Sequence, residues 1–467
     1  MLTIVRKVKE DIKYRLALKE EQVSVGMPGR LSRFATTPSV ELCAIYNSSN
    51  PYKNISKAIM ESQSYLALRR KTQVHMDTAL RKIARGHQDF NRRMHTLVVL
   101  EDALALAKSL GLNEDLTEAI ALGHDCGHTP GGHEGERVLR ANLKTDGEEY
   151  TFKHADQAVV NLEEIEGIHL PREMKAAMKN HGEDEFVDKA LKNKRIFVEK
   201  SPQLDKRDGD GFWATPKGTV LEGILVQIAD NTSSTFHDIK DLIHSGVLTK
   251  EIALRHPKFS SVLEGLGGSV ESLFKDTNAT IAKMRKNVLD HVIENAQIID
   301  GKPLITLGKM TQDFYELRAI NYDFFQYAIQ MNYQDNVIGE QFKAVCEYYR
   351  KNPDKLDEIF LRVIASKRYV HSNVPVRKVI SGVEIGRKAE SHLKDEQIRT
   401  RCVEFIKRSP FGKKIATFIS MSDDTRMNNL AQNIKPDLLN RRNLLYTMQA
   451  FNRNVVKRTA NISIPPR

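Results

Sequence analysis

The sequence predicts an all-α fold, a helical bundle with little or no sheet. Apolar residues recur at steps of three and four over most of the chain, which is the period of a helix that buries one face. Alternating Val- and Ile-rich runs bounded by turn residues, which are typical of strands, are scarce. At 467 residues, with 40% hydrophobic residues, the chain can bury a large core.

The clearest element is a helix at residues 94–112, where Gly111 is placed to end it in a left-handed conformation. Its apolar stripe is expected to consist of Leu97, Leu100, Leu104, Ala107 and Leu110. Asn113 can cap a second helix at residues 114–125, which carries acidic residues in its first turn.

The rest of the chain follows the same helical pattern with one break. Further helices are predicted over residues 153–168, 171–181, 219–243 and 339–352. Residues 201–219, rich in Pro, Gly and Asp, predict a long loop or a hairpin between helices.

The net charge of +11 favours anionic partners such as nucleotides or nucleic acid. The basic stretch after Lys435 fits either a solvated face or a surface that binds single-stranded DNA. No apolar run reaches the length of about 18 residues that a membrane span needs, so no membrane contact is expected. The four cysteines are scattered, which argues against a disulfide framework and favours a cytoplasmic location.

Four side chains are expected to meet at one divalent cation. His95 begins the helix at 94–112 and His124 ends the next one, so antiparallel packing would bring them together. Asp125 follows directly, and Asp230 lies in an apolar helical run where an unpaired carboxylate would be costly. Taken singly, His95 also fits a capping histidine, and Asp230 a carboxylate satisfied by a basic neighbour. Two imidazoles with two carboxylates suit a divalent metal with open positions rather than a closed structural zinc site.

The stretch CGHTPGGHEGE at residues 126–136 is interrupted by a proline and four glycines, which predicts a loop folded over the cation. In it, His128, His133 and Glu136 would face one cavity. The two histidines are candidates for moving a proton or donating to a departing oxyanion, and Glu136 could orient one of them. His154 starts the next helix and is either part of the same pocket or a surface histidine.

The order of these motifs resembles the HD-domain superfamily and is most similar to its deoxyguanosinetriphosphate triphosphohydrolase (dGTPase) branch, which includes the eukaryotic SAM-and-HD-domain dNTPase. The stretch HDCGHTPGGHEGE departs from the family's HDxGHxPFGHxGE only in having a glycine where the family has phenylalanine. The resemblance extends to LRRKTQV (68–74), RRMHTLVV (92–99), IADNTSSTFHDIKD (228–241) and IATFISMSDDTRM (415–427).

The resemblance implies a helical HD enzyme that hydrolyses deoxynucleoside triphosphates, dGTP or several dNTPs, to the deoxynucleoside and inorganic triphosphate. It implies that the metal ligands are His95, His124, Asp125 and Asp230. Mn²⁺ or Mg²⁺ is the first expectation, with Fe²⁺, Ni²⁺ or Zn²⁺ as alternatives. The implied catalytic residues are His133 with Glu136, supported by His128 and His154.

Substrate contacts follow from the same resemblance. Arg92 would contact phosphate, and Gln73 and Asp238 would hydrogen-bond the sugar 3′-hydroxyl. For the base, aromatic residues of the stretch 319–333 near Arg318, notably Tyr322, Phe325 and Tyr327, are either stacking partners or core packing.

Two departures from the family pattern affect specificity. Ser234 stands where the family commonly has the tyrosine that packs on the sugar, which leaves the choice between dNTP and NTP open. The sequence before RRKTQV also differs from the family's, so the base preference can differ from guanine.

The resemblance divides the chain into four expected parts. These are an N-terminal arm (1–54), an HD phosphohydrolase core (55–260), a C-terminal helical part that completes the substrate pocket and oligomer contacts (261–435), and a basic tail (436–467). Family members assemble as dimers to hexamers and several respond to nucleotide effectors, so a homo-oligomer and a nucleotide effector are expected.

Two other functions remain open from the sequence. One is an HD phosphodiesterase or nuclease that acts on single-stranded nucleic acid or on a signalling nucleotide, which the basic tail would suit. The other is a nucleotide-sensing or DNA-binding protein with a residual HD site; the retention of all expected ligands argues against it.

Overall fold

The computed structural model confirms the all-α prediction. It describes residues 29–71, 91–144, 150–182, 195–197, 202, 204–206, 212–244, 246–332, 337–364, 397–422 and 424–434. Within these ranges, strands are confined to two small two-stranded antiparallel sheets. None of the helices in the described ranges is both long and apolar enough to cross a membrane.

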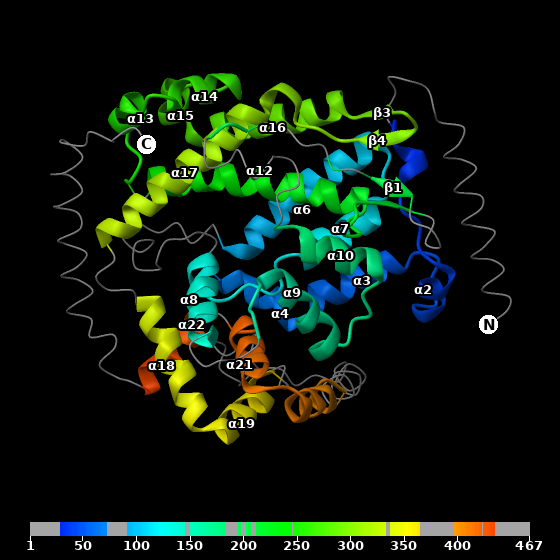
Figure 1. Ribbon diagram of the computed structural model, residues 1–467, viewed down its shortest axis with the longest axis vertical. Helices are drawn as coiled ribbons and strands as arrows, with labels where there is room; N and C mark the ends of the chain where they lie inside the picture. Colours follow the sequence, from blue (N-terminus) through cyan, green and yellow to red (C-terminus); the bar gives the residue numbers. More distant parts are fainter. Residues whose placement is uncertain are drawn as a thin grey trace, which may run out of the picture.

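Three helices form the centre of the bundle: α6 (Arg92–Leu110), α7 (Glu114–Gly123) and α12 (Leu221–His244), which pack against one another (Figure 1). Gly111 ends α6 with a φ of 74°, as predicted. The Asn113 side chain accepts the Leu116 N–H and caps α7, also as predicted. The helices α2 (Val40–Ile45), α3 (Pro51–Glu61), α4 (Gln63–Ala67) and η2 (Leu68–Arg70) precede this centre, and α3 packs on α7.

The predicted apolar stripe of α6 was right near the end of the helix, where Ala107 and Leu110 are buried, and wrong at its start. Leu97 is 38% exposed, whereas the buried residues of the helix include Val99, Ala103 and Leu106. The reason is that α6 packs against both α7 and α12 and buries polar residues as well. A helix enclosed on two sides has no single stripe whose phase the leucines could reveal.

A group of helices at one end of the molecule extends the core over α12 and α6 (Figure 1). Its members are α13 (Lys250–Arg255), α14 (Phe259–Gly265), α15 (Val270–Lys275), α16 (Thr277–Asn295), η4 (Gly308–Met310) and α17 (Thr311–Asn332). Leu31 and Phe34, from the predicted N-terminal arm, are buried in this same core, and Phe34 belongs to η1 (Ser32–Phe34).

A separate hydrophobic core lies at the opposite end (Figure 1). It is built from α8 (Gly132–Lys144), α18 (Val337–Lys351), α19 (Pro353–Ile364), residues 397–408, α21 (Phe411–Ser420) and α22 (Asp424–Ile434). The helix α9 (His154–Val159) continues as a π-helical turn, η3 (Val160–Ile165), and touches both α21 and α10 (Arg172–Asn180). This second core therefore reaches the segment that connects α7 to α9.

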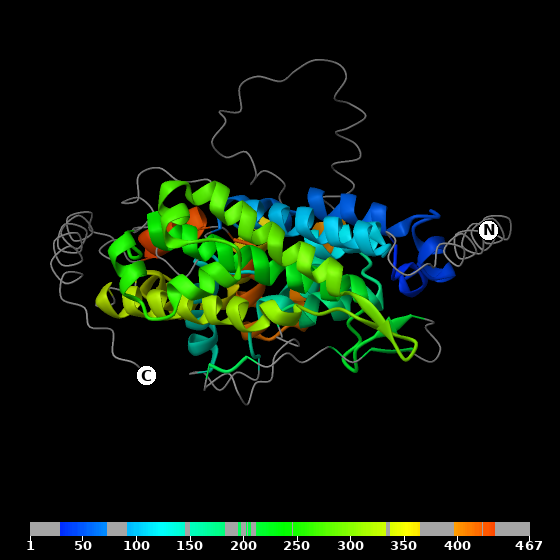
Figure 2. The ribbon, with the colours of Figure 1, turned by 90° about the horizontal axis from the view of Figure 1, so that it is seen from above.

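Two hairpins lie side by side at one edge of the molecule (Figure 1 and Figure 2). The predicted hairpin region contains β1 (Asp205–Lys206) paired with β2 (Trp213–Ala214), and β3 (Gln297–Ile299) pairs with β4 (Lys302–Leu304). The Lys302 ammonium and the Asp205 carboxylate, 2.6 Å apart, join the two hairpins. Trp213 packs edge-on against Phe34, with ring centroids 5.3 Å apart, which assigns the single tryptophan to packing.

Candidate active site

Three helices bring together the four side chains expected to bind a metal, called here the four-ligand set: His95, His124, Asp125 and Asp230. His95 lies in the first turn of α6, His124 and Asp125 follow α7 directly, and Asp230 lies in α12. His95 Nε2 is 2.8 Å from Asp230 Oδ1, and His124 Nε2 is 3.9 Å from the same oxygen. His124 Nε2 is 3.6 Å from Asp125 Oδ1. Ligand atoms that share one ion at about 2.1 Å lie about 3–4 Å apart, so these separations suit a common cation.

The hydrogen bonds of the two histidines direct their Nε2 atoms to the centre of the set. His124 Nδ1 lies 2.7 Å from the Ala121 carbonyl, which can only accept, so this nitrogen carries the proton. Its Nε2 is then a buried lone pair, and it has no hydrogen-bond partner among the described residues. His95 Nδ1 lies 3.2 Å from the Ser233 hydroxyl. A buried acceptor nitrogen of this kind is what a metal ligand provides, so the residues fit a divalent cation.

The electrostatics keep both carboxylates of the set ionised. Burial raises the pKa of Asp125, but the charge of Arg92 and the hydrogen bond from His128 outweigh burial and hold this pKa well below its ordinary value. Arg92 Nη1 donates to Asp125 Oδ2 at 3.0 Å. Burial also raises the pKa of Asp230, but the hydrogen bond from His95 outweighs burial, and the pKa of Asp230 is lowered. Anionic oxygens are therefore available to a cation at neutral pH.

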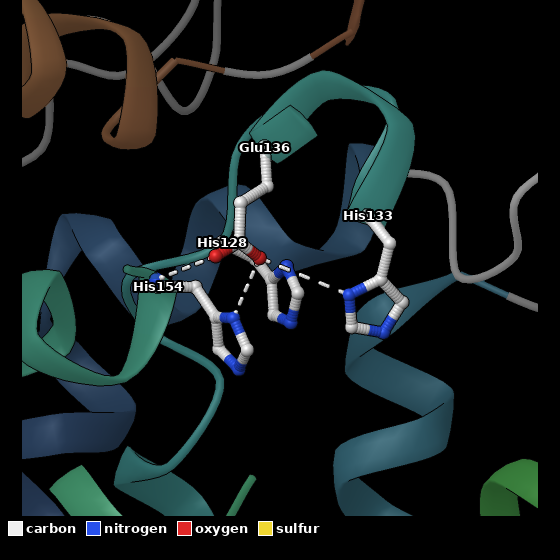
Figure 3. A group of neighbouring side chains, drawn as sticks. All are labelled: His128, His133, Glu136 and His154. Atoms are coloured by element: carbon white, nitrogen blue, oxygen red, sulfur yellow. Dashed lines mark hydrogen bonds and ion pairs between the residues drawn. The ribbon is translucent and has the colours of Figure 1, made fainter. Parts of the chain in front are cut away.

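Beside this set lies the histidine–glutamate cluster, His128, His133, Glu136 and His154, whose side chains gather around the Glu136 carboxylate (Figure 3). His154 Nδ1 is 2.8 Å from Glu136 Oε2, and His133 Nδ1 is 3.8 Å from the same oxygen. The His128 and His154 rings stack with centroids 3.8 Å apart. Burial raises the pKa of Glu136, but its interactions with His133 and His154 outweigh burial and lower this pKa far below its ordinary value, so the carboxyl group is ionised.

The predicted loop over the cation was wrong in its second half, because α8 begins at Gly132 and carries His133 and Glu136. Gly131 and Gly132 adopt φ values of 74° and 60°, and this left-handed turn reverses the chain into the new helix. A Cβ on Gly135 would lie 1.9 Å from the Pro130 carbonyl oxygen, so the glycine permits a close backbone approach. His133 and Glu136, three residues apart, consequently share one helical face.

Two residues near the site carried no predicted role. His181, directly after α10, is 3% exposed, and its Nε2 lies 3.1 Å from His154 Nε2. Its position at the end of a predicted helix, like that of His124, was the available signal. Lys71 is 1% exposed and its ammonium group donates to the His128 carbonyl at 2.7 Å and to the Ser420 carbonyl of α21.

A buried polar network continues from Lys71 between the metal-binding segment and α21. The Asn161 amide of η3 donates to the Cys126 carbonyl at 3.0 Å and to the Ser420 hydroxyl at 3.1 Å. The Gln157 amide of α9 donates to the Thr417 hydroxyl of α21 at 3.0 Å. The C-terminal helix α21 is thus hydrogen-bonded to the segment that bears Asp125 and His128.

The expected substrate residues have different surroundings. Arg318 donates to the side-chain oxygen of Asn231, the neighbour of Asp230, at 2.6 Å. Burial and the Asp241 carboxylate raise the pKa of Asp238 to about 8. Tyr322 is 54% exposed, whereas Phe325 is buried in the core, which supports packing for that residue. Gln73 and the basic tail lie outside the described residues.

Comparison with known proteins shows which protein family the chain resembles. Residues 92–235 match the family model of the HD domain. The chain is 30% identical over 321 residues to a deoxyguanosinetriphosphate triphosphohydrolase-like protein of Clostridium perfringens, an alignment that covers 68% of this chain and 78% of the relative. A protein of the same description from Caldanaerobacter subterraneus is 28% identical over 364 residues, with 77% and 87% covered. One from Leptospira interrogans is 26% identical over 340 residues, with 66% and 81% covered.

Proposed function

Because the chain belongs to the deoxyguanosinetriphosphate triphosphohydrolase-like family of HD-domain proteins, we propose that it hydrolyses deoxynucleoside triphosphates to the deoxynucleoside and inorganic triphosphate. The observation that carries this proposal is the meeting of the four-ligand set with the histidine–glutamate cluster. One group offers ligands to a divalent cation and the other offers proton-transfer residues. Hydrolysis of a phosphate ester needs both functions close together.

In this proposal His95, His124, Asp125 and Asp230 would hold the cation, with Mn²⁺ or Mg²⁺ as the first choice. A bound divalent ion supplies Lewis acidity toward phosphate oxygens. Arg92, whose guanidinium group is buried beside Asp125, would add positive charge toward the phosphates. Its contact with Asp125 also keeps that carboxylate ionised and oriented.

His133 would be the residue that exchanges a proton with the reacting oxygens. Its side chain is 45% exposed, in contrast to His128, which is 1% exposed. The Glu136 carboxylate lies on the Nδ1 side of His133, so with a proton held on Nδ1 the nitrogen that would accept or return another proton is Nε2. The hydrogen bond from His154 and an ion pair with Arg140 at 2.6 Å would hold Glu136 in place for this role.

Substrate selection would depend on residues of α12 and α17. Asp238 would accept the sugar 3′-hydroxyl together with Gln73. Arg318 and the exposed ring of Tyr322 would contact the base. A homo-oligomer, a nucleotide effector, a cytoplasmic location and binding of single-stranded DNA through the tail stay predictions.

The test is to incubate the full chain with each of the eight common NTPs and dNTPs plus Mn²⁺ and to separate the products by chromatography. Triphosphate with deoxynucleoside is the expected result. Release of pyrophosphate or monophosphate would instead support a phosphodiesterase, and binding of single-stranded DNA without turnover would support a non-enzymatic role.

Two variants check the residue assignments in the same assay. Asp125→Ala is expected to lose both metal and turnover. His133→Ala is expected to keep the metal and to lose about 10²-fold or more in rate, as for other general acid–base residues. Full activity in either variant would contradict the assignment.

A further inference from the structure

A buried row of three side chains runs from one expected metal ligand into α12: His95, Ser233 and His237, called here the His95 row. The Ser233 hydroxyl oxygen lies 3.2 Å from His95 Nδ1 and 3.2 Å from His237 Nδ1. Ser233 and His237 are four residues apart and share a face of α12. The three residues are 1%, 1% and 7% exposed, and polar groups so deeply buried need hydrogen-bond partners.

The Ser233 hydroxyl makes the proton positions on the two rings depend on each other. A hydroxyl has one proton, so between two ring nitrogens it can donate to only one and must accept from the other. Both bonds therefore form only when one Nδ1 carries a proton and the other presents a lone pair. His124 differs, because its Nδ1 faces the Ala121 carbonyl, which only accepts and so fixes the proton on Nδ1 without a third group.

Binding of a cation by the four-ligand set selects one of these two arrangements. His95 Nε2 lies 2.8 Å from Asp230 Oδ1, where it can donate a proton to this carboxylate. A cation needs the lone pair of Nε2 instead, so the single proton of the neutral His95 ring must lie on Nδ1 and be donated to Ser233. Ser233 then donates its own proton to His237 Nδ1, which must present a lone pair.

His237 is suited to accept that proton. Burial lowers the pKa of His237 to about 3, so its ring is neutral at neutral pH. The nearby His95, Arg285 and Lys240 act in the same direction. A neutral ring with its proton on Nε2 offers the Nδ1 lone pair that Ser233 needs. Without this acceptor, the Ser233 hydroxyl would donate to His95 Nδ1, which favours the His95 tautomer whose Nε2 cannot bind a cation.

We propose that Ser233 and His237 are positioning residues for the cation. Through the hydroxyl they hold His95 with its proton on Nδ1 and with the Nε2 lone pair directed at the four-ligand set. Loss of such a partner of a metal-binding histidine typically weakens the affinity for the metal by about 10- to 100-fold. Their role rests on the proposed function, which calls for the cation, but cation binding is measurable without any substrate.

The experiment measures the dissociation constant of Mn²⁺ for the full chain in the absence of nucleotide. The protein is stripped with a chelator and titrated with MnCl₂, and free Mn²⁺ is followed by electron paramagnetic resonance. Ser233→Ala removes the hydroxyl, and His237→Phe keeps the bulk of the ring but removes its acceptor nitrogen. Both variants are expected to bind Mn²⁺ about 10- to 100-fold more weakly than the wild type.

Two matched variants separate the hydrogen bond from packing. His237→Asn has a smaller side chain, but its amide oxygen can take the place of Nδ1 as the acceptor. It is expected to bind Mn²⁺ more tightly than His237→Phe and close to the wild-type affinity. Thr235→Val removes a buried hydroxyl of α12 that donates to the Asn231 carbonyl of the same helix, and it is expected to keep the wild-type affinity.

Wild-type affinity in folded Ser233→Ala or His237→Phe would overturn the positioning role. The same conclusion would follow if His237→Asn bound Mn²⁺ as weakly as His237→Phe, because the ring would then act through packing alone. Should Ser233→Ala fail to fold, the two variants of His237 decide. The expected affinities without release of triphosphate would refute the proposed function and leave the positioning role standing, whereas release of triphosphate with equal Mn²⁺ affinity in all variants would do the reverse.

Discussion

Replacement of Lys71 by Met tests whether the C-terminal helix α21 positions the catalytic segment. The Lys71 ammonium group donates to the backbone carbonyls of His128 and Ser420. Ser420 lies 349 residues after Lys71 in the chain. Methionine matches the length of the side chain and removes the charge and the donors. The His128 segment then loses its hydrogen bonds from the Lys71 side chain and can move relative to α21.

Two opposing free energies set the effect on stability. A hydrogen bond from a charged donor is worth about 1.5–3 kcal/mol, so two of them contribute about 3–6 kcal/mol. The desolvation of a buried ammonium costs several kcal/mol, and this cost disappears in the variant. We therefore expect the free energy of unfolding to change by no more than about 2 kcal/mol, because the two terms largely offset each other.

The effect on turnover is expected to be larger than the effect on stability. A displacement of about 1 Å at a reacting group can lower the rate about 10²-fold, so kcat should fall by about 10- to 100-fold. KM is expected to change little, because Lys71 donates to backbone carbonyls of the protein. Amide hydrogen exchange over residues 126–133 should become faster, and Lys71→Arg, which keeps charge and donors, should recover part of the loss.

Lys414→Met is the control, since Lys414 belongs to α21 and its side chain is only 13% exposed, but it pairs with Asp357. It should lower the melting temperature and keep kcat and the exchange rates of residues 126–133. A folded Lys71→Met protein with wild-type kcat and unchanged exchange over those residues would refute the positioning role.

Two further predictions concern stability and specificity. Burial raises the pKa of Asp102 from 3.8 to about 7, although the charge of Arg285 acts in the opposite direction. The contribution of Asp102 to stability is therefore fully present below about pH 4 and is lost as the pH rises through 7. Asp102→Asn should therefore raise the melting temperature relative to the wild type by an amount that grows from pH 5 to pH 8; a constant difference would contradict the shift. Ser234, whose hydroxyl donates to the Asn231 carbonyl, stands where the resemblance to the family implies a tyrosine that packs on the sugar. Ser234→Tyr should increase the ratio of dNTP to NTP hydrolysis, measured as kcat/KM, and an unchanged ratio would show that this position does not contact the sugar.

The sequence was sufficient for the central helices α6, α7 and α12 and for the meeting of the four-ligand set. Both depend on local signals, namely caps such as Asn113 and Gly111 and the position of His95 and His124 at opposite ends of consecutive helices. Asp230 could be predicted because a carboxylate in an apolar helical run needs a partner. The ligand geometry of these residues fits a cation, while metal binding itself stays a prediction.

The start of α8 could not be predicted, because its signal was ambiguous. Glycines at 131 and 132 are equally compatible with a long loop and with a sharp left-handed turn into a helix. Packing of α8 against α18, almost two hundred residues later in the chain, favours the helix. No local pattern reports such a contact.

The contribution of α21 to the site was hidden for a different reason. Ser420 meets Lys71 through its backbone carbonyl, which every residue possesses, so the identity of residue 420 carries no information about this bond. The buried ammonium of Lys71 is the only side chain in that bond, and a lysine in a basic stretch of sequence is ordinarily read as exposed. The Ser420 carbonyl can thus accept from Lys71 whatever side chain residue 420 carries, provided that α21 ends at the same place, whereas the bond from Asn161 needs the Ser420 hydroxyl. It follows that changes in the length of α21 should disturb the Lys71 contact more than substitutions at Ser420.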